Sequence, residues 1–197
     1  IVTERYVNRE TLGQLTIRKL GEVLTGWKDG QFEYKTDALA GAVYEIRAHG
    51  DVFTGDHQTD ANGNRTLWYA DGDLVATVTT GADGQIDKTE FAPMRTPAAY
   101  NFLAVSHNGI KGEVTITLPL GSYDIIEVKA PYGFTLTDDS YTVSFGWDNQ
   151  KNDLVLAETI VSHADGKDKE TAYRIVNIKD ADDKQLTEQK LVFQNDR

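Results

Sequence analysis

Residues 120–134 read Leu120-Gly121-Ser122-Tyr123-Asp124-Ile125-Ile126-Glu127-Val128-Lys129-Ala130-Pro131-Tyr132-Gly133-Phe134. Tyr123 and Ile125 fall on one face of an alternating pattern, which is the period of a half-buried β-strand. Glu127 falls on the same face. The segment therefore predicts a strand with an apolar inward face, a carboxylate on that face, and a turn at Ala130-Pro131.

The same alternation recurs along the chain and predicts an all-β fold. Further strands are expected at residues 14–19, 42–46, 74–78, 114–118, 141–145, 154–156, 173–176 and 191–193. Asp-Gly turn signals separate several of them, at residues 71–72, 83–84 and 165–166. Many short strands and no long segment of helical period indicate a β-sandwich or barrel.

Two segments fit the strand pattern poorly, residues 51–70 and residues 87–111, and we interpret them as loop-rich insertions in a smaller sandwich. The second insertion has room for a short helix at residues 96–103, where Pro97 suits a first helical turn. Residues 1–12 show no alternation and are interpreted as a junction with a preceding domain. Residues 13–197 are then one β-sandwich domain.

Composition narrows the function classes. With 20 basic and 31 acidic residues, the 197-residue chain has a formal charge of −11, which disfavours binding to nucleic acid. It lacks cysteine, which excludes disulfides, thiolate metal sites and thiol nucleophiles. No apolar run reaches the roughly 18 residues of a membrane span, so membrane insertion is not expected.

Three polar residues occupy apolar faces of predicted strands. Lys19 shares its face with Leu15 and Ile17 by alternation. Glu127 follows Tyr123 and Ile125 in the same way, and Asn195 follows Leu191 and Phe193. Burying any of them alone would be costly, whereas together they can satisfy one another.

An ordinary interpretation of these residues is also open. Lys19 would extend to the rim, Glu127 would pair with it as a common salt bridge, and Asn195 would end a strand. The spacing alone favours this interpretation. Asp196 is a rival partner for the lysine, although alternation points it away from the apolar face.

Several segments resemble a known family. Residues 39–46 (Leu-Ala-Gly-Ala-Val-Tyr-Glu-Ile) and residues 120–134 resemble the prealbumin-like Cna-B/SpaA-type domain of Gram-positive adhesins and pilins. Residues 15–19 and 192–195 resemble its first and last strands. The resemblance implies an immunoglobulin-like, prealbumin-like (Cna-B) β-sandwich. It further implies a spontaneous isopeptide bond between Lys19 and Asn195, with Glu127 as the catalytic group.

The resemblance implies a stalk or backbone module of an adhesin or pilus on the cell-wall-attached, extracellular surface of a Gram-positive bacterium. No cofactor is expected, and the chain would not be a turnover enzyme, because a stable amide forms once per chain. Its partners would be neighbouring domains of the same protein. The alternative is an adhesive domain that binds a host protein or glycan through its inserted loops.

Other candidate sites are weaker. Residues 83–91 copy the second half of an EF-hand loop, but Thr79 and Gly81 stand where its leading carboxylates belong, so calcium is not expected. Residues 60–64 indicate a turn rather than a metal site. The four histidines, His49, His57, His107 and His163, lack zinc-ligand spacing. Trp27, Trp68, Tyr69 and Trp147 indicate either core packing or an exposed recognition patch. The sequence locates no carboxylate pair for a polysaccharide-degrading enzyme.

Overall fold

The computed structural model describes residues 12–55, 59–81, 89–98, 103–106, 111–136, 140–148, 153–156, 160–162, 173–179 and 185–195. Side chains are described within these ranges up to Gly146, except for Ser106. Beyond Gly146 the strands are described by their backbone and register.

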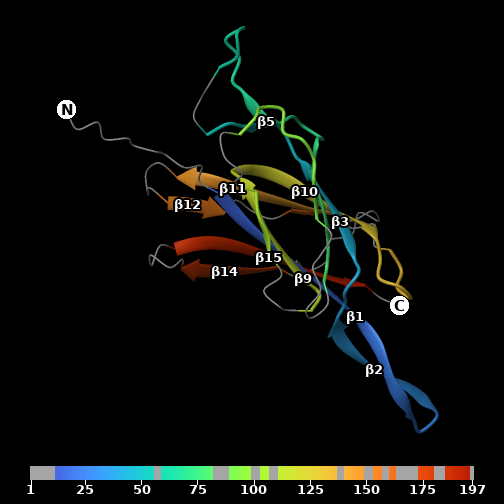
Figure 1. Ribbon diagram of the computed structural model, residues 1–197. Helices are drawn as coiled ribbons and strands as arrows, with labels where there is room; N and C mark the ends of the chain where they lie inside the picture. The colour runs from blue at the N-terminus through green and yellow to red at the C-terminus, as the bar shows by residue number, and fades with distance from the viewer. Residues whose placement is uncertain are drawn as a thin grey trace.

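The first sheet has β1 near its centre. In the described residues it contains six strands. In spatial order they are β14 (Tyr173–Lys179), β15 (Gln185–Asn195), β1 (Leu12–Lys28), β9 (Glu113–Pro119) and β8 (Val105–Ser106), with β2 (Gln31–Ala38) also paired to β1. β1 and β15 are parallel, and the other pairs are antiparallel. The parallel pair places an early strand beside the last described strand (Figure 1).

The second sheet is antiparallel and has seven strands in the described residues. In spatial order they are β12 (Asp153–Leu156), β11 (Ser140–Asp148), β10 (Gly121–Lys129), β3 (Val43–Ala48), β6 (Leu74–Thr79) and β7 (Glu90–Phe91), with β13 (Ile160–Ser162) also paired to β11. β4 (Val52–Phe53) and β5 (Leu67–Tyr69) form a separate pair.

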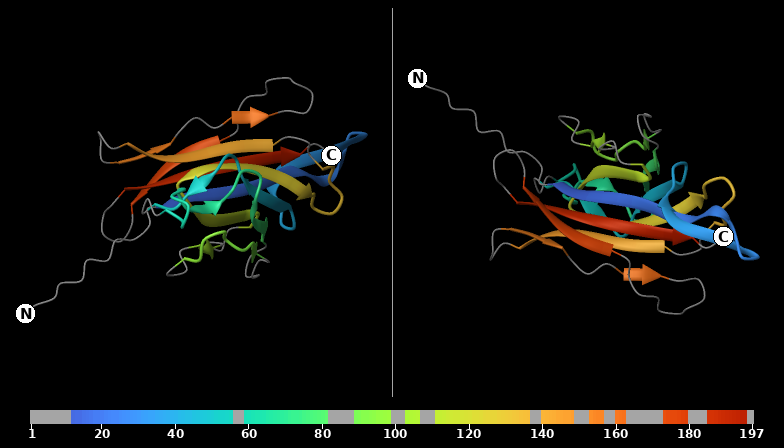
Figure 2. Two further views of the ribbon diagram at one scale, coloured as in Figure 1. Left: turned by 90° about the horizontal axis from the view of Figure 1, so that it is seen from above. Right: turned by 90° about the horizontal axis from the view of Figure 1, so that it is seen from below.

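The core lies between the two large sheets, as in a β-sandwich. Leu15, Ile17 and Ile116 enter it from the first sheet, and Tyr44 and Ile125 enter it from the second. All five are at most 1% exposed. The two views in Figure 2 show the sheets as layers, with the insertions at their margin. The predicted all-β sandwich is therefore confirmed.

Each strand predicted from alternation is present, but several strands were not predicted, and the longest of them is β2. β1 continues to Lys28 and forms a hairpin with β2, and this hairpin projects beyond the sandwich (Figure 1). Its turn is Asp29-Gly30, with φ of 52° and 79°. Such left-handed pairs favour tight hairpins, so the dipeptide was the available signal.

The two predicted insertions are present and carry short strands. Residues 51–70 contain β4 and β5, whose Val52, Trp68 and Tyr69 join the core. Residues 87–111 contain β7 and β8. The helix predicted at residues 96–103 is absent from its described part, since residues 96–98 and Leu103 are not helical, and residues 99–102 lie outside the described ranges. No helix that could cross a membrane occurs in the part of the chain that the structure describes.

Candidate functional site

Lys19 and Glu127 meet inside the sandwich. Lys19 is on β1 and Glu127 on β10, so the contact joins the two sheets. The Lys19 Nζ atom donates a hydrogen bond to Glu127 Oε2 at 2.6 Å, and both side chains are fully buried. Lys19 therefore does not extend to the rim, as the ordinary interpretation of its spacing required.

Tyr44 is a third member of this cluster. It lies on β3 directly opposite Glu127 of β10, and its hydroxyl donates to Glu127 Oε2 at 3.1 Å. Sequence reasoning placed this tyrosine on a strand but gave it no role. The available signal was its position on the face of Ala42 and Ile46, because a buried tyrosine hydroxyl usually requires a partner.

The cluster has unusual electrostatics because it is buried. Loss of hydration lowers the pKa of Lys19 below its usual 10.5, and the hydrogen bond and charge of Glu127 oppose this only in part. Burial also raises the pKa of Tyr44 well above 10, and Glu127 adds to this effect through its charge and hydrogen bond. The site thus makes the lysine amine easier to deprotonate than it is in water, and it keeps the tyrosine hydroxyl protonated.

The backbone of Lys19 is held at a junction of three strands. Its amide donates to Gly112 O, and its carbonyl accepts from the Leu39 amide, both at 2.9 Å. Gly112 has φ of 76°, and a Cβ there would lie 2.9 Å from the Leu39 nitrogen. Only glycine fits this close crossing without strain. The crossing fixes where β1 changes its neighbour from β9 to β2.

A buried threonine holds the segment that leads into β3. The Thr80 hydroxyl accepts from the Ala42 amide at 3.1 Å and donates to the Leu39 carbonyl at 2.9 Å. The Thr80 backbone also bonds to Gly41 and Ala42. These bonds set the start of the strand that carries Tyr44.

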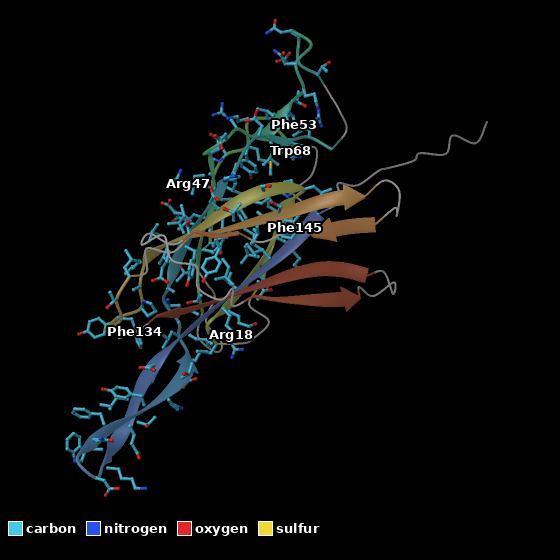
Figure 3. The ribbon with its side chains drawn as sticks, turned by 180° about the vertical axis from the view of Figure 1, so that it is seen from behind. Arg18, Arg47, Phe53, Trp68, Phe134 and Phe145 are labelled. Atoms are coloured by element: carbon cyan, nitrogen blue, oxygen red, sulfur yellow. The ribbon has the colours of Figure 1, made fainter. Side chains whose placement is uncertain are left out.

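Asn195 is the last residue of β15, and its backbone lies opposite Gly21 in the parallel register. Lys19 lies opposite Phe193 in the same register. Gly21 is buried, and a Cβ built on it would meet Leu39 and Phe134. Figure 3 shows Phe134 at the end of the sandwich from which the hairpin projects. The Asn195 side chain and the rival residue Asp196 lie outside what is described, so the role of Asn195 stays a prediction.

The other candidate sites give no second cluster. Asp60 Oδ1 accepts from the amides of Asn62 and Asn64, which is the geometry of a turn. Of the EF-hand-like segment, residues 83–88 lie outside the described ranges, and Glu90-Phe91 form β7. His49 is exposed and lies 3.0 Å from Asp124 Oδ2, whereas the other three histidines lie outside the described ranges. Among the described residues no group of metal-ligating side chains is present.

The predicted aromatic residues do not form one patch. Trp68 and Tyr69 are buried in the core, at 7% and 0% exposure, and only the backbone of Trp147 is described. Trp27 is 61% exposed on the hairpin and makes an edge-on contact with Phe32. Of the two alternatives, core packing is therefore the correct one for Trp68 and Tyr69. Trp27 and its neighbours Phe32 and Tyr34 are exposed together on the hairpin.

Comparison with known proteins supports the family resemblance over part of the chain. Residues 103–160 match the model of SpaA, a prealbumin-like fold domain. The matched segment includes β9, β10 and β11, and with them Glu127, whereas Lys19 and Asn195 lie outside it. No curated protein matches the chain. The resemblance to SpaA-type domains is thus confirmed for this segment, and the matched model describes a structural fold.

Proposed function

We propose that this chain is a structural stalk or backbone module of a Gram-positive cell-surface adhesin or pilus, stabilised by an isopeptide bond between Lys19 and Asn195. The observation that carries the proposal is the buried contact between Lys19 and Glu127 on facing sheets. A lysine and a glutamate with fully buried side chains are rare in a core unless they are paired or reactive.

The register supports the choice of Asn195 as the acceptor. Gly21, opposite Asn195, is two residues after Lys19, and two residues is the repeat of one strand face. Neighbouring strands are about 4.8 Å apart and rise about 3.3 Å per residue, so the two Cα atoms are separated by roughly 8 Å. An extended lysine side chain spans most of this distance. The glycine opposite Asn195 adds no side chain to the gap.

The chemistry is the one that the family resemblance implies for these three residues. An uncharged Lys19 amine attacks the side-chain carbonyl carbon of Asn195, while a protonated Glu127 donates its proton to the carbonyl oxygen. The resulting carboxylate takes a proton from the lysine nitrogen and passes it to the departing amine. The tetrahedral intermediate collapses as the former carbonyl oxygen of Asn195 returns its proton to Glu127. A Lys–Asn amide forms, one ammonia leaves, and Glu127 ends in its starting state.

A covalent link at this position suits a load-bearing module. β1 and β15 are adjacent, and the bond would join their backbones near the point where β15 ends. Tension applied before β1 and after β15 would pass through this bond, and most of the sandwich would carry no force. Neighbouring domains of the same surface protein are the partners that this role requires. The SpaA-type match is consistent with an extracellular location.

Intact-mass measurement tests the proposal. The folded wild-type chain should be lighter than its sequence mass by one ammonia, and Lys19→Met, Glu127→Gln and Asn195→Ala should each keep the full mass. Digestion should give one branched peptide that joins the segments containing Lys19 and Asn195. A folded wild-type chain with its full mass would rule out the bond.

Two matched variants control for general effects of substitution. Lys35→Met removes an exposed lysine of the hairpin, and Asn177→Ala removes an asparagine of β14. Both should lose ammonia as the wild type does. If Asn177→Ala kept the full mass and Asn195→Ala lost ammonia, a different acceptor would be assigned.

An adhesive role is the second candidate, and the hairpin rather than the insertions favours it. The register shift between Leu24 and Gly26 places Leu24, Trp27, Phe32 and Tyr34 on one face of the hairpin. All four are between 42% and 61% exposed. A host protein bound there should lose affinity when Trp27 and Phe32 are both changed to alanine, and a panel of host matrix proteins checks this. Equal binding by the double variant would contradict it.

A further inference from the structure

Two hydrogen bonds converge on one oxygen of the buried carboxyl group. Glu127 Oε2 accepts from Lys19 Nζ at 2.6 Å and from the Tyr44 hydroxyl at 3.1 Å. Tyr44 is fully buried on β3, directly opposite Glu127 on β10. The tyrosine therefore contacts the proposed proton donor without being the nucleophile or its target.

We propose that Tyr44 is a positioning residue for bond formation, and that its hydroxyl determines which oxygen of Glu127 carries the transferable proton. The inference rests on the proposed isopeptide function. A protonated carboxyl group has one carbonyl oxygen, which accepts, and one hydroxyl oxygen, which donates. A donor held against Oε2 makes Oε2 the carbonyl oxygen, so the proton resides on Oε1.

The surroundings keep Tyr44 in this role. Burial raises the pKa of its hydroxyl well above 10, so the group stays a donor through the neutral range. Its strand begins at a segment that Thr80 fixes through bonds to Leu39 and Ala42. Orientation matters because small misplacement of a reacting group can cost a large factor in rate. Glu127 is thereby held from the second sheet while Lys19 approaches from the first.

Tyr44→Phe is the direct test, because it keeps the ring and removes the donor. Each chain is made by cell-free synthesis, samples are quenched in acidic denaturant, and the fraction lighter by one ammonia is followed with time. Tyr44→Phe should form the bond about tenfold more slowly than the wild type. Its rate should also persist to higher pH, since the charged carboxylate has lost a donor that stabilised it.

Two other tyrosines supply matched controls. Tyr123 of β10 donates its buried hydroxyl to the Pro119 carbonyl at 2.6 Å, so Tyr123→Phe removes a structural hydrogen bond on the same strand as Glu127. Tyr69 has a buried hydroxyl that has no hydrogen-bond partner among the described residues. Both variants should form the bond at the wild-type rate and with the wild-type pH profile. A general loss of stability would slow the reaction without moving its pH dependence.

A second substitution guards against misfolding of Tyr44→Phe. Incorporation of 3-fluorotyrosine at position 44 keeps the size of the side chain and makes the hydroxyl a stronger donor. The alkaline limb of the rate profile should then move to lower pH, opposite to Tyr44→Phe. If the wild type loses ammonia and neither change at position 44 alters rate or pH profile, the positioning role is overturned and bond formation stands. If the wild type keeps its full mass, both fail.

Discussion

Lys19 shows how one residue can be costly to the fold and central to the proposed chemistry. Its side chain is fully buried and forms an ion pair with Glu127. Removing one partner of a buried pair usually costs more than replacing both, because an unpaired charge remains. The pair is therefore best studied in Asn195→Ala, where no bond can form.

In that background, Glu127→Gln should destabilise the fold by about 3 kcal/mol, because it leaves Lys19 without a counter-charge. Adding Lys19→Met to Glu127→Gln should recover most of the lost stability, since neither charge then remains in the core. Urea unfolding of the four chains in the cycle checks this. A double variant as unstable as Glu127→Gln alone would contradict the view that the buried charge is the source of the loss.

The pH dependence of the same background follows from the lowered pKa of Lys19. Between that lowered value and 10.5 the unfolded chain binds more protons at this residue than the folded chain, so stability should rise with pH. Above pH 10 the raised pKa of Tyr44 acts in the opposite direction, because the unfolded tyrosine ionises first. Unfolding midpoints from pH 7 to 11 should show the rise, and Lys19→Met should remove it.

Tyr69 offers a simpler prediction. Within the part of the chain that the structure describes, its hydroxyl is buried without a hydrogen-bond partner, and burial raises its pKa to about 12. Tyr69→Phe should stabilise the protein by about 1 kcal/mol at neutral pH, because an unsatisfied polar group is removed. It should also weaken the loss of stability between pH 10 and 12. Lower stability at pH 7 would indicate that the hydroxyl has a partner.

At the residue scale, the sequence predicted part of the candidate site. Alternation placed Lys19 and Glu127 on apolar faces, and the structure brings them into contact. The contact of the Tyr44 hydroxyl with Glu127 was missed, because strand alternation predicts which face of the sheet a side chain lies on but not its hydrogen-bond partner. The roles in bond formation came from family resemblance, and they stay predictions.

At the scale of elements, alternation located most of the longer strands of both sheets, but not β2 or the full length of β1. From Glu22 onward the strand leaves the core, so its apolar residues are no longer buried. An alternating apolar pattern therefore could not predict this part of the strand. The separate pair β4 and β5 was missed for the opposite reason. These strands are too short for an alternating pattern, and tertiary packing of Trp68 and Tyr69 determines them.

Gly112 tests the strand junction beside Lys19. Gly112→Ala would place a side chain at positive φ and within 3.0 Å of the Leu39 backbone. It should therefore lower the free energy of unfolding several times more than Gly30→Ala does. Gly30 has a similar φ of 79° but open space around it, so its cost should be only the backbone penalty of about 1–2 kcal/mol. Denaturant unfolding in the Asn195→Ala background compares them. Equal losses would mean that the junction relaxes.

The contact between Arg95 of the second insertion and Asp73, just before β6, has a pH signature. Arg95 donates to both carboxylate oxygens of Asp73, at 2.6 and 2.9 Å. The Ala70 amide also donates a hydrogen bond to the Asp73 carboxylate. These bonds lower the pKa of Asp73 from 3.8 to about 2. Their stabilisation is present above 3.8 and is lost as pH falls through about 2. Asp73→Asn should flatten this part of the acid-unfolding curve. The effect should be modest, because Arg95 is largely exposed and solvent screens the pair.

At the scale of the whole molecule, the order of strands explains what the proposed bond would achieve. β1 and β15 are close in space, yet Lys19 and Asn195 are 176 residues apart (195 minus 19). Closing a loop of this size restricts the unfolded chain and is worth roughly 5 kcal/mol by the estimate used for disulfides. Heat or denaturant should thus reveal a higher midpoint for the wild type than for Asn195→Ala.

Force separates the covalent explanation from ordinary stability. When single molecules are pulled from both ends, Asn195→Ala should release the whole sandwich, and the segment between residues 19 and 195 would add roughly 600 Å of contour length. The bonded wild type should release none of that segment, because the load crosses from β1 to β15 through the bond. Asn177→Ala, which keeps the bond, should behave as the wild type. A wild type that unfolds at higher force but releases the full length would owe its strength to packing alone, since only a covalent link withholds chain.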